Sequence, residues 1–190
     1  MHSLAIDIIR GCWITFGIVW LLAAVSTKQS VYRESRVQRL RYSIALVVGS
    51  FLLFRGHRLG YPLNARIIAQ MDAITVIAVI LCVAGLVFCI WARITLGSNW
   101  SGTITLKEKH ELIVRGPYRL VRHPVYTGLL AMVFATVIVV GHVAGIIGAT
   151  LVFVSFWIKL SAEEEVMLKQ FPDQYAAYRQ RVRRLIPFIF

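Results

Sequence analysis

The stretch ITVIAVILCVAGLVFCIWA, residues 74–92, contains no charged residue. It is close to the roughly 20 residues that cross a hydrocarbon core, and a helix of this kind satisfies its own main-chain polar groups in lipid. The same character extends over the whole chain, which has 190 residues, of which 58% are hydrophobic and 16% charged. A soluble domain of this size could not bury so much apolar surface. The sequence therefore predicts an integral membrane protein.

Further apolar runs flank this stretch on both sides. They predict membrane spans at residues 4–25, 42–54, 126–140 and 143–160. The result is an all-α membrane fold with about five transmembrane helices. The second run is short for a full crossing, although arginines at its ends can snorkel to the interface. Only Gly141 and His142 separate the last two runs, so these should form a tight helical hairpin. Residues 163–187 have an amphipathic pattern and predict a broken, interfacial C-terminal helix that ends at Pro187.

The chain is predicted to be a single membrane domain over residues 1–190. The first three spans occupy 1–92, and a long polar loop, the hairpin and the tail occupy 93–187. Of the 21 lysines and arginines, 17 fall in the loops after spans one and three, at the end of the last span (Lys159) and in the tail, and four fall elsewhere. This asymmetry predicts an N-terminus outside the cell and a cytoplasmic loop and tail that face anionic lipid. Nucleic-acid binding is not predicted, because no soluble basic face is visible despite the net charge of +12.

The segment GPYRLVRHPVYTG, residues 116–128, places polar groups at the start of the fourth span. Because the last two spans form a hairpin, the start of one and the end of the other should be neighbours in space. His123 and Glu163 can therefore face one pocket. Simpler interpretations remain open for this segment: Arg122 as an anchor to lipid phosphate, His123 as a helix cap beside the first-turn Pro124, and the tyrosines as interfacial belt residues.

Lys159 and Glu163 are spaced i,i+4, so a continuing helix places them on one face. They could form an ion pair at a helix end or part of a solvated acidic cluster. Alternatively, Glu163 could hold a cationic ligand and Lys159 an anionic group, since ionisable residues at membrane depth are commonly functional. The three cysteines lie in apolar runs without a CxxC pair, and the sequence predicts no metal site.

Three segments together resemble the isoprenylcysteine carboxyl methyltransferase family and its phospholipid N-methyltransferase relatives. They are LGSNWS (96–101), HELIVRGPYRLVRHPVYTG (110–128) and EEEVMLKQFPDQYAAYRQRVRRLIP (163–187). The resemblance implies a multispan methyltransferase that binds S-adenosylmethionine between its last helices and its cytoplasmic segments. A lipophilic or lipidated acceptor would enter from the bilayer. The acceptor would be a carboxylate of the isoprenylcysteine type, with a phospholipid amine or a small hydrophobic thiol as alternatives.

The same resemblance assigns residues to roles. It implies that the cofactor is bound by His110, Glu111, Leu112, Ile113, Tyr118, His123, Pro124, Val125, Tyr126 and Glu163. Lys159 stands where the prenylcysteine enzymes have an arginine that binds the substrate carboxylate, and Arg122 could help to hold an anionic group. Lysine offers a point charge in place of a bidentate fork, which leaves other acceptors open. A steroid-reductase-like enzyme that binds NADPH and a non-catalytic membrane protein are the alternatives from other classes.

Overall fold

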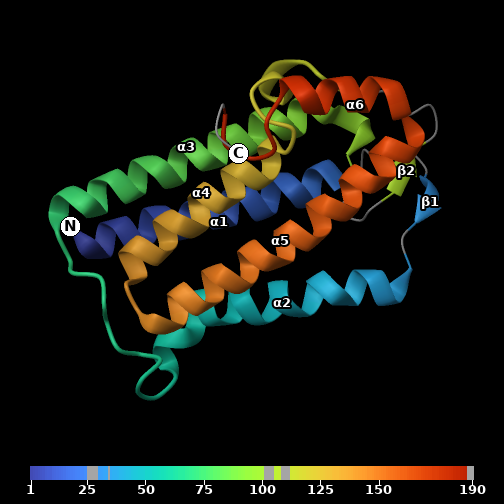
Figure 1. Cartoon of the computed structure of the whole chain (residues 1–190). Coiled ribbons are helices and arrows are strands. Elements are labelled where there is room, and N and C mark those ends of the chain that lie inside the picture. The colour runs from blue at the N-terminus through green and yellow to red at the C-terminus, as the bar shows by residue number, and fades with distance from the viewer. Residues whose placement is uncertain (25–29, 34, 101–104, 108–111, 188–190) are drawn as a thin grey trace.

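The structure, a computed structural model, describes residues 1–24, 30–33, 35–100, 105–107 and 112–187. Its helices form one elongated bundle with a short helix across one end (Figure 1). In chain order the elements are α1 (His2–Ala24), β1 (Ser30–Arg33), α2 (Arg36–Arg55), η1 (Gly56–Arg58), α3 (Asp72–Leu96), η2 (Gly97–Asn99), β2 (Thr105–Lys107), η3 (Gly116–Arg119), α4 (Pro124–Val140), α5 (Val143–Gln170) and α6 (Pro172–Arg181).

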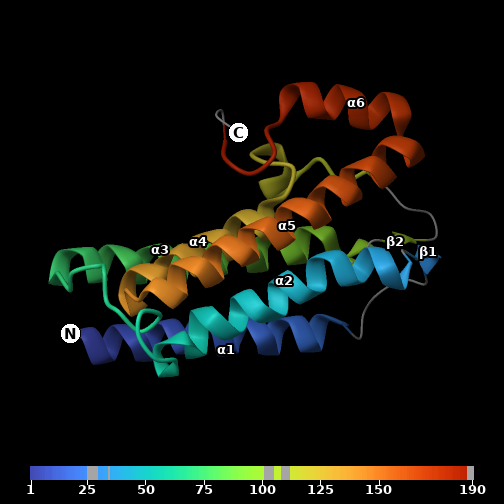
Figure 2. The same cartoon turned by 60° about the horizontal axis from the view of Figure 1, so that its bottom comes forward.

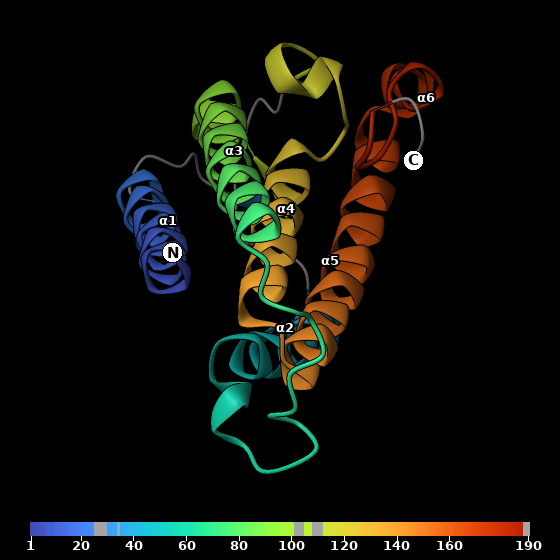
Figure 3. The same cartoon turned by 90° about the vertical axis from the view of Figure 1, so that its left-hand side faces the viewer.

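The bundle confirms the all-α membrane fold. Four of the described helices (α1, α2, α3 and α5) are long and apolar enough to cross a membrane. Helix α4 is also apolar but has 17 residues, which corresponds to about 25 Å of helix. A count of five complete crossings therefore stays a prediction. Figures 2 and 3 show α3 beside α4 and α2 beside α5, with α1 on the outer side of the α3–α4 pair.

The predicted hairpin of the last two spans is present. Gly141 ends α4 with a φ of 70° and donates its N–H to the carbonyl oxygen of Val137, and α5 begins two residues later.

However, α5 does not end near residue 160 as expected. It continues to Gln170, because residues 161–170 contain no helix breaker and Pro172 then disfavours helical backbone at Phe171. The C-terminal helix α6 ends at Arg181 and not at Pro187, because residues 182–185 leave the helix to pair with the start of α4.

A two-stranded antiparallel ribbon was not expected from the sequence. Strand β1 follows the first span and β2 follows the third, with Arg33 opposite Thr105. The ribbon joins the loops after spans one and three at one end of the bundle. This is also the end that carries α6 (Figure 1), so the polar segments converge there as predicted.

Two pairs of glycines allow the helices to approach closely. A Cβ atom on Gly148 of α5 would lie 2.6 Å from the carbonyl oxygen of Gly49 and 2.6 Å from the amide nitrogen of Leu53 on α2. Gly85 and Gly128 bring α3 and α4 together in the same way, with a Cβ on Gly128 placed 2.5 Å from the Gly85 carbonyl oxygen. Small residues at such crossings maximise packing between helices in lipid. These contacts hold α2 close to α5 and α3 close to α4.

Replacing Gly148 with alanine is expected to lower the stability of the fold. The added methyl group has main-chain atoms as its neighbours, so the helices must separate, at a cost of about 1–3 kcal/mol. Thermal denaturation in detergent measures the effect. Gly17→Ala on α1 is the matched control, because no atom lies within 4 Å of a Cβ built there. Equal melting temperatures for both variants would contradict this account of the α2–α5 contact.

Candidate cofactor and acceptor site

The start of α4 is joined to the C-terminal tail through main-chain hydrogen bonds. The amides of Arg122 and His123 donate to the carbonyl oxygens of Arg183 and Arg184, at 2.8 and 3.1 Å. The Thr127 hydroxyl donates to the Leu185 carbonyl oxygen at 2.7 Å. These bonds place residues 182–185, which we call the tail strap, alongside the segment that carries His123.

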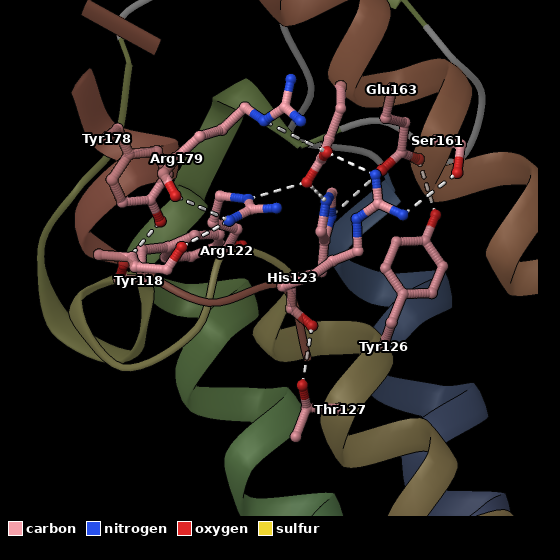
Figure 4. A network of polar contacts seen from close by, with 12 residues as sticks. Tyr118, Arg122, His123, Tyr126, Thr127, Ser161, Glu163, Tyr178 and Arg179 are labelled. Atoms are coloured by element: carbon pink, nitrogen blue, oxygen red, sulfur yellow. Dashed lines mark hydrogen bonds and ion pairs between the residues drawn. The ribbon is translucent and has the colours of Figure 1, made fainter. Parts of the chain in front are cut away.

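A buried carboxylate lies beneath the tail strap. The side chain of Glu164 is 3% exposed and accepts hydrogen bonds from Arg122 Nε at 2.8 Å and Arg184 Nη2 at 2.6 Å. Its Oε1 atom is also 3.1 Å from His123 Nε2, and Arg179 Nε is 3.9 Å away. Glu164 therefore ties α5 to the start of α4, to α6 and to the tail strap. Arg122 and His123, both labelled in Figure 4, belong to this network.

The sequence predicted Glu163 as a site residue and did not single out Glu164. The two carboxylates are neighbours, but successive residues of an α-helix point about 100° apart. Glu163 therefore borders the cavity, Glu164 points toward the arginines, and Glu165 is exposed. The run of three glutamates was a signal that one of them could be buried, but it could not show which.

Glu163 lies on the cavity side of α5. It accepts a hydrogen bond of 2.7 Å from the hydroxyl of Tyr126 (Figure 4), and its side chain is 26% exposed. His123 Nδ1 lies 3.8 Å from Glu163 Oε2. One turn earlier on the same helix, Lys159 Nζ lies 5.5 Å from the ring centre of Tyr42 and 5.9 Å from that of Tyr126. A carboxylate and an ammonium group thus border one space, with aromatic rings between them.

Two tyrosines fasten α6 over this space. Tyr178 donates its hydroxyl proton to the carbonyl oxygen of Tyr118 at 2.6 Å (Figure 4). Burial raises the pKa of Tyr118 and that of Tyr178 well above the ordinary tyrosine value. Both phenols therefore stay protonated, and Tyr178 remains a hydrogen-bond donor at any physiological pH. Tyr118 is held in place beside the cavity.

A cavity of about 520 Å³ extends from these tyrosines into the bundle. Its polar end lies near Glu163, Lys159 and Tyr118, and its other end lies between the apolar faces of four helices. That apolar end is lined by Trp13, Phe16, Trp20, Leu46, Ser50, Leu53, Phe54, Leu129, Val133, Val152 and Phe156. The volume falls within the roughly 300–1,000 Å³ of small-molecule sites.

Most of the predicted site residues border this cavity. They are Leu112, Ile113, Tyr118, Arg122, His123, Pro124, Val125, Tyr126, Lys159 and Glu163. His110 and Glu111 lie outside the described residues. The structure brings the predicted residues together, and their individual roles stay predictions. Among the residues that the structure describes, no group of three or more His, Cys, Asp or Glu side chains could hold a metal ion.

The contributions of α1 and α2 to the cavity were not expected. Trp13, Phe16 and Trp20 come from the first span, in which the sequence shows no motif. Phe16 and Trp20 stack with ring centres 4.1 Å apart, and Trp20 packs edge-on against Trp100 at 6.1 Å. The C-terminal end of α1 is held by Arg93, whose Nη2 donates to the Ala23 carbonyl oxygen at 2.6 Å.

Comparison with known proteins identifies similar chains. Residues 73–174 match the family model described as phospholipid methyltransferase. A rice protein (Oryza sativa subsp. indica) named as a probable protein-S-isoprenylcysteine O-methyltransferase is 31% identical over 119 residues, which cover 61% of this chain and 62% of that protein. The protein-S-isoprenylcysteine O-methyltransferase of Xenopus laevis is 28% identical over 204 residues, which cover 98% of this chain and 69% of that protein.

A solved structure also resembles the fold. It is described as the eukaryotic intramembrane Ras methyltransferase isoprenylcysteine carboxyl methyltransferase, and it aligns with a TM-score of 0.56 at 26% identity. The alignment covers 84% of this chain and 55% of that chain. The chain thus spans about three fifths of the length of the rice relative and about half of the solved structure.

Proposed function

The chain belongs to the phospholipid methyltransferase family, and from this premise we propose that it is a membrane methyltransferase dependent on S-adenosylmethionine. We further propose that its acceptor is the carboxylate of a lipophilic molecule of the isoprenylcysteine type. The observation that carries the proposal is the continuous cavity that has Glu163, Lys159 and Tyr118 at one end and apolar walls at the other. Such a cavity can hold a charged donor and a lipid-soluble acceptor in contact.

The polar end suits S-adenosylmethionine. When bound, this cofactor supplies a methyl group on a positively charged sulfur. The Glu163 carboxylate is partly shielded from water and is close enough to complement a positive charge, while Tyr118 and Tyr126 offer flat faces for apolar parts of a ligand. The side chains of Leu112 and Ile113 add an apolar wall. These residues are proposed to bind the cofactor together with the segment from His123 to Tyr126.

Lys159 supports an anionic acceptor. Its ammonium group lies between the rings of Tyr42 and Tyr126 and borders the cavity one turn from Glu163. A carboxylate is already ionised at neutral pH, since an α-carboxyl has a pKa of about 3.5. It needs no general base, so positioning and removal of water can accomplish the reaction. An amine acceptor would need deprotonation and would meet the positive charge of Lys159.

Arg122 is better suited to positioning than to catalysis. The sequence suggested that it could hold an anionic group of the substrate. In the structure its guanidinium already donates to Glu164 and to the carbonyl oxygen of Val182. These bonds support a role in which Arg122 holds His123 and the tail strap in place beside the cavity, and the acceptor carboxylate is left to Lys159.

The site is proposed to face the cytoplasm. It lies at the end of the bundle that carries the β1–β2 ribbon and α6, where the loops, the tail and Lys159 of α5 account for 17 of the 21 lysines and arginines. The lipophilic or lipidated acceptor would reach the cavity from the bilayer, because residues of α1 and α2 border its apolar end.

Calorimetric titration of the detergent-purified protein with S-adenosylhomocysteine tests the cofactor proposal, with NADPH titrated in parallel. Saturable binding of S-adenosylhomocysteine alone is expected. Transfer of a labelled methyl group to N-acetyl-S-farnesylcysteine then tests the acceptor. Binding of NADPH in preference to S-adenosylhomocysteine by folded protein would refute a methyltransferase, and methylation of phosphatidylethanolamine in place of the cysteine derivative would refute the carboxylate acceptor.

Replacing Lys159 with glutamine is expected to raise the KM for the carboxylate acceptor by about tenfold or more. The variant loses one charge-assisted contact, which contributes about 1.5–3 kcal/mol. Lys159→Arg keeps the charge and should retain most of the affinity, which makes it the matched control. Steady-state kinetics with varied acceptor give both values. An unchanged KM in Lys159→Gln would remove Lys159 from the acceptor site.

A further inference from the structure

We propose that Tyr42 of α2 is a positioning residue, which holds the ammonium group of Lys159 in place at the edge of the cavity. This inference rests on the proposed function, in which Lys159 binds the carboxylate of the acceptor. Tyr42 lies outside residues 73–174, the part of the chain that matches the family model. It does not line the cavity itself, whereas Lys159 does. Tyr42 therefore acts on the acceptor through the lysine.

Two aromatic rings from different helices attract the ammonium group. Lys159 Nζ lies 5.5 Å from the ring centre of Tyr42 on α2 and 5.9 Å from that of Tyr126 on α4. Both distances are within the roughly 6 Å over which an aromatic face attracts a cation. The attraction is stronger where water is excluded, and Tyr42 is only 5% exposed. The ring of Tyr42 thus restrains the charge from the α2 side.

Tyr42 is itself fixed to α5, the helix that carries the lysine. The buried hydroxyl of Ser155 donates to the carbonyl oxygen of Tyr42 at 2.8 Å. Ser155 and Lys159 are spaced i,i+4 and therefore lie on one face of α5, one turn apart. The close contact between Gly49 and Gly148 holds the same two helices together farther along. The ring of Tyr42 thus has a defined place relative to the lysine.

A lysine that binds an anion benefits from such restraint. Its charge is compact and sits on a flexible four-carbon stem, so ordering the side chain when a ligand binds costs free energy. The second ring is fixed as well, because the Tyr126 hydroxyl donates to Glu163 at 2.7 Å (Figure 4). The two rings hold the ammonium group before the acceptor arrives. Loss of the Tyr42 ring should weaken recognition of the carboxylate and leave recognition of the hydrocarbon unchanged.

The test compares an acid with its neutral twin. Calorimetry with S-adenosylhomocysteine present gives the affinities of N-acetyl-S-farnesylcysteine and of its methyl ester. The two ligands differ only at the carboxylate, so the ratio of their affinities reports recognition of the charge and cancels any effect on the apolar chain. The unmodified protein is expected to bind the acid about tenfold or more tightly than the ester. Tyr42→Leu should lower this ratio by about three- to tenfold.

Three variants serve as controls. Tyr42→Phe keeps the ring and should keep the ratio, which makes it the matched control. Tyr42→Met also lacks a ring, and its flexible side chain fills irregular spaces, so it repeats the test if Tyr42→Leu lowers the melting temperature. Lys159→Gln should abolish the preference for the acid. Adding Tyr42→Leu to Lys159→Gln should change the ratio no further, because the ring acts through the lysine.

A separate assay of methyl transfer to N-acetyl-S-farnesylcysteine distinguishes this inference from the proposed function. If no methyl group is transferred but the ratio of affinities changes as expected, the positioning role holds and the proposed reaction fails. If transfer occurs and the ratio is the same in the unmodified protein, Tyr42→Leu and Tyr42→Met, the reaction stands and the inference is overturned. Equal affinities for acid and ester in the unmodified protein would also overturn it, as would a further fall of the ratio when Tyr42→Leu is added to Lys159→Gln.

Discussion

Glu164→Gln is expected to abolish methyl transfer and to lower the stability of the fold by about 3 kcal/mol. The substitution keeps the size of the side chain but removes its charge. Arg122, Arg184 and His123 then face a neutral amide in a site that is almost closed to water. Breaking a buried ion pair from one side is costly because the remaining charges lose their compensation.

The adjacent Glu165 provides the control for this prediction. Glu165→Gln makes the same chemical change one position later on an exposed surface, where loss of a carboxylate has little effect on stability. Melting temperature and S-adenosylhomocysteine binding should both fall in Glu164→Gln and stay unchanged in Glu165→Gln. Native stability together with full activity in Glu164→Gln would show that the buried network does not position the site.

Glu163→Ala is expected to weaken S-adenosylhomocysteine binding by about 100-fold while leaving the fold intact. Glu163 is the carboxylate that borders the cavity, and a hydrogen bond to a charged group contributes about 1.5–3 kcal/mol. Glu163 accepts a hydrogen bond from Tyr126, and its side chain is partly exposed. The structural cost of removing it is therefore small, unlike the cost at Glu164.

Tyr126→Phe separates the two roles that Glu163 could have. This variant removes the hydrogen bond to Glu163 but keeps the carboxylate and the aromatic ring, so cofactor affinity should fall by less than about tenfold. Calorimetry gives the affinities, and melting temperature confirms the fold. Unchanged affinity in Glu163→Ala would exclude Glu163 from the cofactor site, and an equal loss in both variants would assign the effect to the hydrogen bond itself.

The membrane fold could be predicted from the sequence because it depends on local signals. The charge-free run at 74–92 indicates a span by its length and composition, and the single connection at Gly141 and His142 indicates a hairpin. The helix ends were predicted less well. The predicted ends were placed where the hydropathy falls. A helix can continue past that point through polar turns, as α5 does over residues 161–170.

The candidate site depends on contacts that are distant in the sequence. Glu164 meets Arg122 across 42 positions, and Trp13 meets Thr136 across 123 positions. Spacing along one helix places Lys159 and Glu163 on a common face. It does not show which of the three consecutive glutamates points toward the arginines. That choice depends on where the tail strap lies. The contact between Trp13 and Phe54 beside the cavity could not be predicted either, because these residues resemble ordinary lipid-facing residues until α1 and α2 are placed together.

The tail strap has a consequence for biosynthesis. Residues 182–185 bind the start of α4 largely through their carbonyl oxygens, so the site cannot close until the ribosome has added Leu185. All of the apolar helices precede this segment, so a chain that lacks it still contains every helix that enters the membrane. A chain released early by premature termination would then be inserted but inactive. Assembly of the proposed site therefore depends on translation having reached the tail strap.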